Sequence, residues 1–273
     1  MLLLTWSAVI GSAANPPPSN QRKTPYMFAR LKHSDPARLH LVLMLVLTFS
    51  TGVIDAVGYL GLDRVFTGNM TWNVVILGMA LVGADGLPVL GPAVALAAFM
   101  IGAAVAGRTL KPEAAGWSRR TTVLLAAVGV ILAGIAAILF AHAARGGDPL
   151  TVVVTGAMAA AMGLQAATAR HLSVKDVTTV VVTSTLTGLA ADSRLGGGTG
   201  QHWARRFGAV ILILSGAAAG AALLNFHVGF GVLLSAILSL AVACAGAAAS
   251  NRPAAKAPQA EAPEAAVSGT APR

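Results

Sequence analysis

The chain has few charged residues for its size. Asp, Glu, Lys and Arg make up 11% of its 273 residues, whereas soluble domains average about 25%. The hydrophobic share is 56% and the mean hydropathy is +0.74. Several apolar runs reach the roughly 20 residues that a helix needs to cross a bilayer. The composition therefore excludes an ordinary soluble domain and predicts an all-α, polytopic membrane protein.

Other scarcities exclude particular kinds of site. The single cysteine, Cys244, excludes an intrachain disulfide framework. His40, His142 and His227 lie near the ends of apolar runs without metal-ligand spacing. No arrangement of Ser, His and Asp suggests a nucleophile triad, and the glycines at 196–198 lack the Lys-Ser/Thr of a phosphate loop. We therefore expect no enzyme, no metal and no other cofactor.

Basic residues outnumber acidic ones, and the formal net charge is +9. Basic loops orient membrane helices and meet anionic lipid, which accounts for this excess. The sequence leaves no compact soluble segment that would carry a nucleic-acid surface. The lipid bilayer is therefore an expected partner, and nucleic acid is not.

Six apolar runs are long enough to span a bilayer. They lie near residues 39–61, 88–107, 121–143, 150–169, 207–225 and 228–248. Two shorter runs, 70–84 and 177–190, would each cover only about 20 Å of a roughly 30 Å core as helices. Each short run is either a tilted span or a re-entrant half-helix.

The distribution of basic residues favours the re-entrant alternative. If both short runs return to the face they enter from, 17 of the 19 Lys and Arg lie on the face of the N-terminus. If both cross, the split falls to 12 against 7, and the short basic loop 108–120 moves to the opposite face. Because cytoplasmic loops are enriched in Lys and Arg, the sequence predicts six spans with both termini cytoplasmic.

The order span, short run, span, span occurs twice, in residues 39–143 and 150–248. The two units start at opposite faces, which predicts an inverted repeat of the kind found in transporters. A few residue matches agree with it: Gly52 and Ala56 with Gly163 and Ala167, Thr67 with Thr178, and Thr71 with Thr183. About 210 membrane residues make a slim bundle, so a homodimer is a further expectation.

Both ends have a composition unlike that of the spans. Residues 1–38 form a basic extension and residues 249–273 a tail rich in Ala, Pro and Glu, and we expect both to be disordered. Residues 1–10 are apolar, but they are few and no Lys or Arg precedes them. A signal peptide and a translation start at Met27 both remain open.

Asp55 is the most informative residue, because it is the one charged residue inside the long apolar run 39–62. A charge there costs several kcal/mol unless it faces a bundle interior or a water-filled cavity. Tyr59 follows four residues later on the same helix face. Gly52 and Ala56 form a small-residue stripe that allows close approach of another helix. Asp55 is therefore the leading candidate for a substrate, ion or proton site.

Polar residues crowd the start of the first short run. They are Thr67, Asn69, Thr71 and Asn73. A half-helix N-terminus carries free N–H groups and a partial positive charge, so it can bind an anion or a polar substrate group. From the second repeat, we expect Gln165, Thr168 and Thr183 to face this site, although no carboxylate accompanies them.

Each of these polar residues also has a purely structural interpretation. Membrane threonines usually bond their own backbone. Asn69 and Asn73 are equally compatible with helix caps or interhelical hydrogen bonds. Asp55 itself is compatible with a structural hydrogen bond.

Four stretches resemble one family. They are residues 51–60 (TGVIDAVGYL), 65–75 (VFTGNMTWNVV), 162–170 (MGLQAATAR) and 180–187 (VVVTSTLT). Together they resemble the YoaK-like family of bacterial multi-spanning membrane proteins, a domain of unknown function, over roughly residues 39–248. The resemblance implies an integral membrane protein and no established substrate. Members usually carry Gly where Trp72 stands, so we expect the Trp72 ring to narrow or reshape the site.

These observations lead to two functional hypotheses. The first is a small secondary transporter or channel-like permease of the bacterial inner membrane, with Asp55 binding an unknown small molecule, ion or proton. The second is a non-transporting scaffold, sensor or partner subunit, in which Asp55 makes a structural interhelical hydrogen bond. An intramembrane enzyme is a weaker third reading, because no second buried carboxylate or His accompanies Asp55.

Overall fold

The computed structural model describes residues 36–84, 86–114, 116–142, 148–172, 182–198 and 203–250. The two predicted disordered ends fall almost wholly outside these residues. Thr178 and the rest of 173–181, which open the second short run, also lie outside them.

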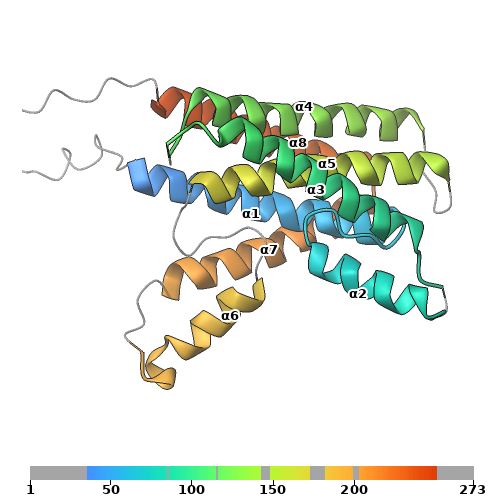
Figure 1. Ribbon diagram of the computed structural model, residues 1–273, viewed down its shortest axis with the longest axis horizontal. Coiled ribbons are helices and arrows are strands. Elements are labelled where there is room, and N and C mark those ends of the chain that lie inside the picture. The colour runs from blue at the N-terminus through green and yellow to red at the C-terminus, as the bar shows by residue number, and fades with distance from the viewer. Residues whose placement is uncertain are drawn as a thin grey trace, which may run out of the picture. The chain divides into compact units, whose positions relative to one another are not determined.

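Six long helices make up most of the described chain (Figure 1). They are α1 (Pro36–Gly61), α3 (Leu90–Leu110), α4 (Arg119–Ala141), α5 (Pro149–Leu172), α7 (Trp203–Leu224) and α8 (Val228–Ser250). All six are long and apolar enough to cross a membrane. Two short apolar helices, α2 (Met70–Leu81) and α6 (Val182–Ala191), and one 3₁₀ turn, η2 (Arg194–Gly196), complete the described elements. The predicted all-α class, with six spans and two short segments, is confirmed.

Three of the long helices start with a side-chain cap, and at α5 Asp148 Oδ1 accepts the Leu150 N–H at 3.0 Å. At α4, the Ser118 hydroxyl accepts the backbone N–H of Thr121 at 3.3 Å, and Thr121 Oγ1 accepts the Ser118 N–H at 3.4 Å. At α8, Nδ1 of His227 accepts the Gly229 N–H at 3.1 Å. Each cap satisfies a backbone donor that the first helical turn leaves without a partner.

The first short helix, α2, lies between two helix ends that are close together. Arg64, just after α1, donates to the carbonyl of Gly86, just before α3, at 3.3 Å. A Cβ atom on Gly91, in the first turn of α3, would meet the side chain of Val65 at 2.7 Å. The end of α1 therefore lies close to the start of α3. The connection that contains α2 leaves the bundle and rejoins it at this same end (Figure 1).

The second short helix, α6, is fastened to the start of α7. Arg206 donates to the carbonyl of Gly188 at 2.8 Å and pairs with Asp192 at 2.5 Å. The beginnings of α1 and α4 and the end of α8 also meet at one end of the bundle. There the Trp117 ring stacks on the His40 ring, with 5.8 Å between the ring centroids, and packs against Gly246.

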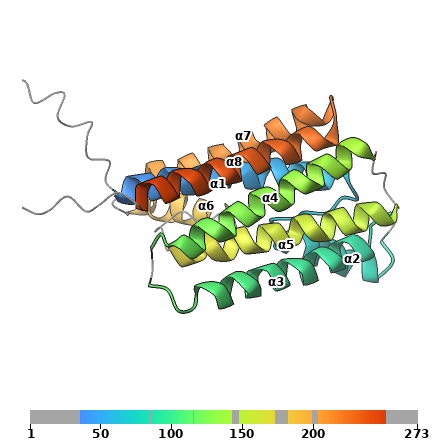
Figure 2. The same cartoon turned by 90° about the horizontal axis from the view of Figure 1, so that it is seen from above.

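The long helices pack in three main pairs: α1 with α7, α3 with α5, and α4 with α8 (Figure 2). α1 also contacts α8, and α5 also contacts α4, whereas the direct contact between α1 and α5 is slight. α1 is the most enclosed span, with 67% of its apolar window buried, against 17% for α7. Asp55 therefore lies on the span that is best shielded from lipid.

Glycines bring the backbones of two helix pairs together. In the α1–α7 pair, a Cβ atom on Gly52 would collide with the carbonyl oxygen of Ile213. In the α3–α5 pair, a Cβ atom on Gly163 would collide with the carbonyl oxygen of Phe99. Small residues at helix interfaces allow this close approach in membranes. We call these two contacts the glycine seams.

Each glycine seam has a second contact on the facing helix. A Cβ atom on Gly216 of α7 would collide with the carbonyl of Phe49, and one on Gly102 of α3 with the carbonyl of Ala160. Phe49 lies three residues before Gly52, and Ala160 lies three residues before Gly163. The two seams therefore match residue for residue.

Candidate functional site

Asp55 lies on the buried face of α1 and is 7% exposed. Its Oδ1 accepts the backbone N–H groups of Thr67 at 3.1 Å and Gly68 at 2.7 Å. The N–H of Asn69 also interacts with this carboxylate. Successive backbone N–H groups of this kind form a concavity that binds anions. The carboxylate thus fastens the loop 62–69 to α1.

The loop reaches Asp55 because α1 offers a glycine one turn later. The carbonyl of Gly58 accepts the N–H of Val65 at 3.4 Å. A Cβ atom at Gly58 would collide with the carbonyl oxygen of Val65. Gly58 therefore allows the loop to fold back along α1 toward the carboxylate.

Asn73 fastens the same loop from α2. It is fully buried, its Oδ1 accepts the Phe66 N–H at 2.9 Å, and its Nδ2 donates to the Phe66 carbonyl. Asn69 precedes α2 at its N-cap position but makes no side-chain cap hydrogen bond. Of the two asparagines, Asn73 therefore holds the loop.

The backbone N–H groups just before α2 already have an acceptor within the chain. The N–H groups that precede the first turn of this helix already have Asp55 as their acceptor. These three N–H groups are therefore not available to a substrate anion, whereas binding by the N–H groups of the first turn of α2 itself stays a prediction. The Asp55 carboxylate satisfies these donors, and its negative charge beside the start of α2 complements the positive end of the helix dipole.

Gln165 brings α5 to the same region. It is 1% exposed, and its Nε2 donates to Thr51 Oγ1 at 3.3 Å. A Cβ atom on Gly68 would meet the side chains of Thr51, Met162 and Asp55 at 2.9, 3.2 and 3.3 Å. Thr51, Asp55, Thr67, Gly68 and Gln165 therefore form one buried group, which we call the polar cluster.

Two oxygens of the polar cluster have no partner. Thr67 Oγ1 and Gln165 Oε1 are buried and make no hydrogen bond to any residue that the structure describes. An unpaired buried polar atom costs about 1–3 kcal/mol, and a bound water or ion is one way in which native proteins satisfy such atoms. These oxygens and the carboxylate are suited to a cation, a proton carrier or a hydrogen-bond donor.

Several predicted site residues do not reach the polar cluster. Tyr59 is 40% exposed, and its ring packs on Phe66 at 5.0 Å. Thr71 on α2 is also exposed. Thr183 on α6 is exposed, and its carbonyl accepts the Thr187 hydroxyl at 2.9 Å. These three residues were predicted to line the site, and their exposure places them outside it.

Thr168 and Trp72 also depart from expectation. Thr168 is fully buried, but its hydroxyl donates to the carbonyl of Leu164 at 2.7 Å, in its own helix. The Trp72 ring is 54% exposed and stacks on Phe66 at 6.2 Å. It therefore belongs to an outward aromatic row with Tyr59 and does not narrow the buried site, contrary to the expectation from the resemblance.

Sequence reasoning missed two members of the polar cluster. Thr51 lies four residues before Asp55, a spacing that places both on one helix face and was available as a signal. Gly68 gave no signal, because its part depends on the fold of the loop. Among the described residues, no group of three or more His, Cys, Asp or Glu comes together to hold a metal.

Comparison with known proteins places this architecture in one family. Residues 43–246 match the family described as "Protein of unknown function (DUF1275)". The chain is also 32% identical over 151 residues to the UPF0700 transmembrane protein YoaK of Bacillus subtilis (strain 168). That alignment covers 55% of this chain and 65% of the relative, which is less than two thirds of the relative's length. No solved structure matches the chain.

Proposed function

The chain belongs to the DUF1275 family of proteins of unknown function, and from this premise we propose that it is a small secondary transporter or channel-like permease of the bacterial inner membrane. That it is a multi-pass membrane protein follows from its six apolar helices and its transmembrane relative. The observation that supports transport is the polar cluster. It combines the carboxylate of Asp55, inside a span, with the unpaired oxygens of Thr67 and Gln165.

The chemistry of the polar cluster favours a cation or a proton over an anion. The N–H groups that face Asp55 are already bonded to its carboxylate. The groups that remain unsatisfied are the oxygens of Thr67 and Gln165. Oxygen ligands with one negative charge suit a monovalent cation, a protonated amine or a proton relay. We therefore propose that Asp55 couples movement of the cargo to charge, without enzymatic chemistry.

The matching glycine seams support an inverted repeat in which α1, α2, α3 and α4 correspond to α5, α6, α7 and α8. Under this exchange the α1–α7 pair becomes the α5–α3 pair, and the α4–α8 pair maps onto itself. The polar cluster lies where α1 meets α5, and the direct contact between these two helices is slight. Transporters built from inverted repeats move one repeat against the other around such a central site.

Two further parts of the proposal concern topology and assembly. The start of α1 and the end of α8 meet at Trp117, so both described ends lie at one end of the bundle, and the basic residues of loop 108–120 favour the cytoplasm for it. Other helices of the chain bury only 17% of the apolar window of α7. The rest of this helix is open to a second copy, which favours a homodimer formed through α7. Light scattering of the protein in detergent measures the mass of the assembly and so distinguishes a homodimer from a monomer.

A second candidate function rests on a different observation. Asp55 Oδ1 accepts two backbone N–H groups of the loop, which is what a structural role requires. The protein would then be a scaffold, sensor or partner subunit whose loop 62–69 is fixed by the carboxylate. A substitution that removes the charge of Asp55 but keeps an acceptor oxygen distinguishes transport from the structural role.

Asp55→Asn makes this separation, because an amide oxygen still accepts the Thr67 and Gly68 N–H groups. The purified chain is reconstituted into liposomes, and entry of Na⁺, K⁺ or H⁺ is followed with fluorescent indicators under an imposed gradient. We expect flux above that of empty liposomes for wild type and background flux for Asp55→Asn. Thr168→Val is the matched control, since it removes a buried hydroxyl that bonds only its own helix.

Equal flux from wild type and Asp55→Asn would remove Asp55 from the mechanism. Absence of flux for all three cations, together with a folded Asp55→Asn and an unfolded Asp55→Ala, would favour the second candidate. Thermal unfolding of each variant in detergent supplies the folding measurement.

A further inference from the structure

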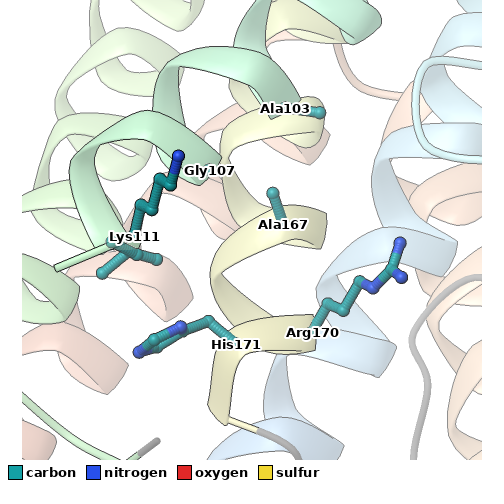
Figure 3. A pocket seen from close by; sticks show the side chains of 7 residues that line it. Ala103, Gly107, Lys111, Ala167, Arg170 and His171 are labelled. Carbon is teal, nitrogen blue, oxygen red and sulfur yellow. The ribbon is translucent and has the colours of Figure 1, made fainter. Parts of the chain in front are cut away.

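A cavity of about 560 Å³ opens at the end of the bundle opposite to α2, between the last turns of α3 and α5. Its lining comes from Ala103, Gly107, Leu110 and Lys111 of α3 and from Ala167, Arg170 and His171 of α5 (Figure 3). This volume falls within the range of about 300–1,000 Å³ that is typical of small-ligand pockets. The cavity lies away from the polar cluster and plays no part in the proposed transport.

The charge of this cavity has one sign. Lys111, Arg170 and His171 line it, and none of its lining residues within the described part of the chain is acidic. Glu113, two residues after Lys111, pairs with Arg120 at 3.1 Å. His171 is held in place by the α3–α4 connection, where its Nε2 lies 3.2 Å from the Ala114 carbonyl. The cavity therefore presents positive charge to any ligand that enters it.

The inner wall of the cavity is apolar and roomy. Ala103, Gly107 and Ala167 contribute almost no side chain, and Leu110 beside them is 2% exposed. A Cβ atom at Gly107 would meet nothing within 4 Å. A ligand with a charged head and an apolar body fits a cavity that is basic at its mouth and apolar within.

The position of the cavity points to the bilayer as the source of that ligand. α3 and α5 are membrane-spanning candidates, and the cavity lies at their last turns, Leu110 and Leu172 being their final residues. Lipid headgroups lie at this depth, and basic pockets between transmembrane helices bind anionic headgroups. Arg108 and Arg119 add positive charge at the same end, whereas Arg120 is paired with Glu113.

The opposite end of the bundle offers a natural comparison. The matching glycine seams place Asn225, Tyr59 and Leu60 at the positions that correspond to Lys111, Arg170 and His171. None of these three carries a positive charge. The basic character is therefore specific to the α3–α5 end and is not a by-product of the shared helix packing.

We propose that this cavity binds the phosphate-bearing headgroup of an anionic phospholipid, with Lys111 and Arg170 contacting the phosphate and the apolar wall receiving the start of an acyl chain. Each basic side chain near an anionic lipid surface increases affinity roughly five-fold. Loss of both therefore weakens binding on the order of 10- to 30-fold.

The test uses the full-length chain in neutral detergent, to which phosphatidylglycerol or phosphatidylcholine with identical acyl chains is added. Native mass spectrometry counts bound lipid, and thermal unfolding reports stabilisation by binding. We expect wild type to retain phosphatidylglycerol in preference to phosphatidylcholine. Lys111→Gln combined with Arg170→Gln should lose this preference, whereas Arg108→Gln, on the same helix and outside the cavity, should keep it.

Gly107→Leu tests the cavity without changing charge. Open space around Gly107 predicts a folded variant that excludes the lipid. Unchanged lipid preference in both Gly107→Leu and the double variant would overturn the proposal. A parallel thermal-unfolding experiment adds inorganic phosphate at millimolar concentration in place of the lipid. Stabilisation by phosphate equal to that by phosphatidylglycerol would identify a soluble ligand and overturn the lipid assignment.

Discussion

Gly52 on α1 meets the α7 backbone, and Gly163 on α5 meets the α3 backbone in the same way. Three residues further on, the two halves diverge. In the first half that position is Asp55, and in the second it is Ala166. The first half thus carries a carboxylate bonded to a loop, where the second half carries a methyl group. The packing of the helices is shared by the two halves, and the polar chemistry is not.

The difference shows which interactions build the scaffold and which build the site. The glycine seams depend on backbone atoms, so they tolerate different side chains around them. The polar cluster depends on Asp55 and Gln165, and the matching positions of the other half carry Ala166 and Ile54. In the proposed repeat, the helix packing is therefore shared, while the buried carboxylate belongs to the first half.

The strongest test of the repeat is topological, because its result is all or nothing. In a Cys244→Ser background, Ala84→Cys after α2 and Arg194→Cys after α6 each place one exposed thiol beside a short helix. We expect an impermeant maleimide to label the two from opposite faces of the membrane. Labelling of both from one face would contradict an inverted relation between the halves.

The next effect concerns the glycine seams themselves. Gly52→Ala and Gly163→Ala each force a methyl group against a carbonyl oxygen, and overpacking of this kind costs about 1–3 kcal/mol or more. We expect both to lower the midpoint of thermal unfolding in detergent by similar amounts. Gly134→Ala on α4 is the control, since a Cβ atom there meets nothing within 4 Å. A large effect at only one seam would show that the halves are held together differently.

A smaller effect separates the two asparagines of the first half. Asn73→Ala leaves the part-buried backbone N–H and carbonyl of Phe66 without their Asn73 partners, and an unsatisfied buried group costs about 1–3 kcal/mol. Asn69→Ala removes no side-chain cap and should have little effect. Urea or thermal unfolding of the two variants measures the difference. Equal losses would mean that the loop is not held through Asn73.

The smallest expected effect lies at the caps of α4 and α8, two helices that correspond in the proposed repeat. Ser118→Ala removes a capping box and His227→Ala removes a ring-nitrogen cap. Loss of a helix cap typically costs about 1 kcal/mol. We expect similar small decreases in thermal stability from both. Val130→Ala, at an exposed position on α4 away from the caps, provides the baseline.

The spans and the importance of Asp55 were predictable from the sequence because both depend on local composition. An apolar run of about 20 residues reads as a span wherever it occurs, and a charge within it must be shielded. Asp55 is indeed 7% exposed on the most enclosed span. The identity of its partners was not predictable, because the N–H groups of Thr67 and Gly68 reach it only through the fold of the loop.

The remaining errors share one physical origin. Helical spacing places Tyr59 near the face of Asp55, but neighbouring helices decide how far that face is covered, and Tyr59 is 40% exposed. The sequence likewise could not distinguish Asn69 from Asn73, since both stand at the start of one helix. Burial depends on packing by distant segments, which residue spacing alone does not contain.

The attachment of Asp55 to the loop has a consequence for competition. The carboxylate is a ligand tethered to its own binding site, so its effective concentration there is millimolar or higher. A free carboxylate or phosphate must outcompete it before reaching the N–H groups of Thr67 and Gly68. Only a chain that lacks this side chain, such as Asp55→Gly, leaves these donors open to added formate or acetate. Asp55 thus acts as a built-in competitor that excludes small anions from the start of α2.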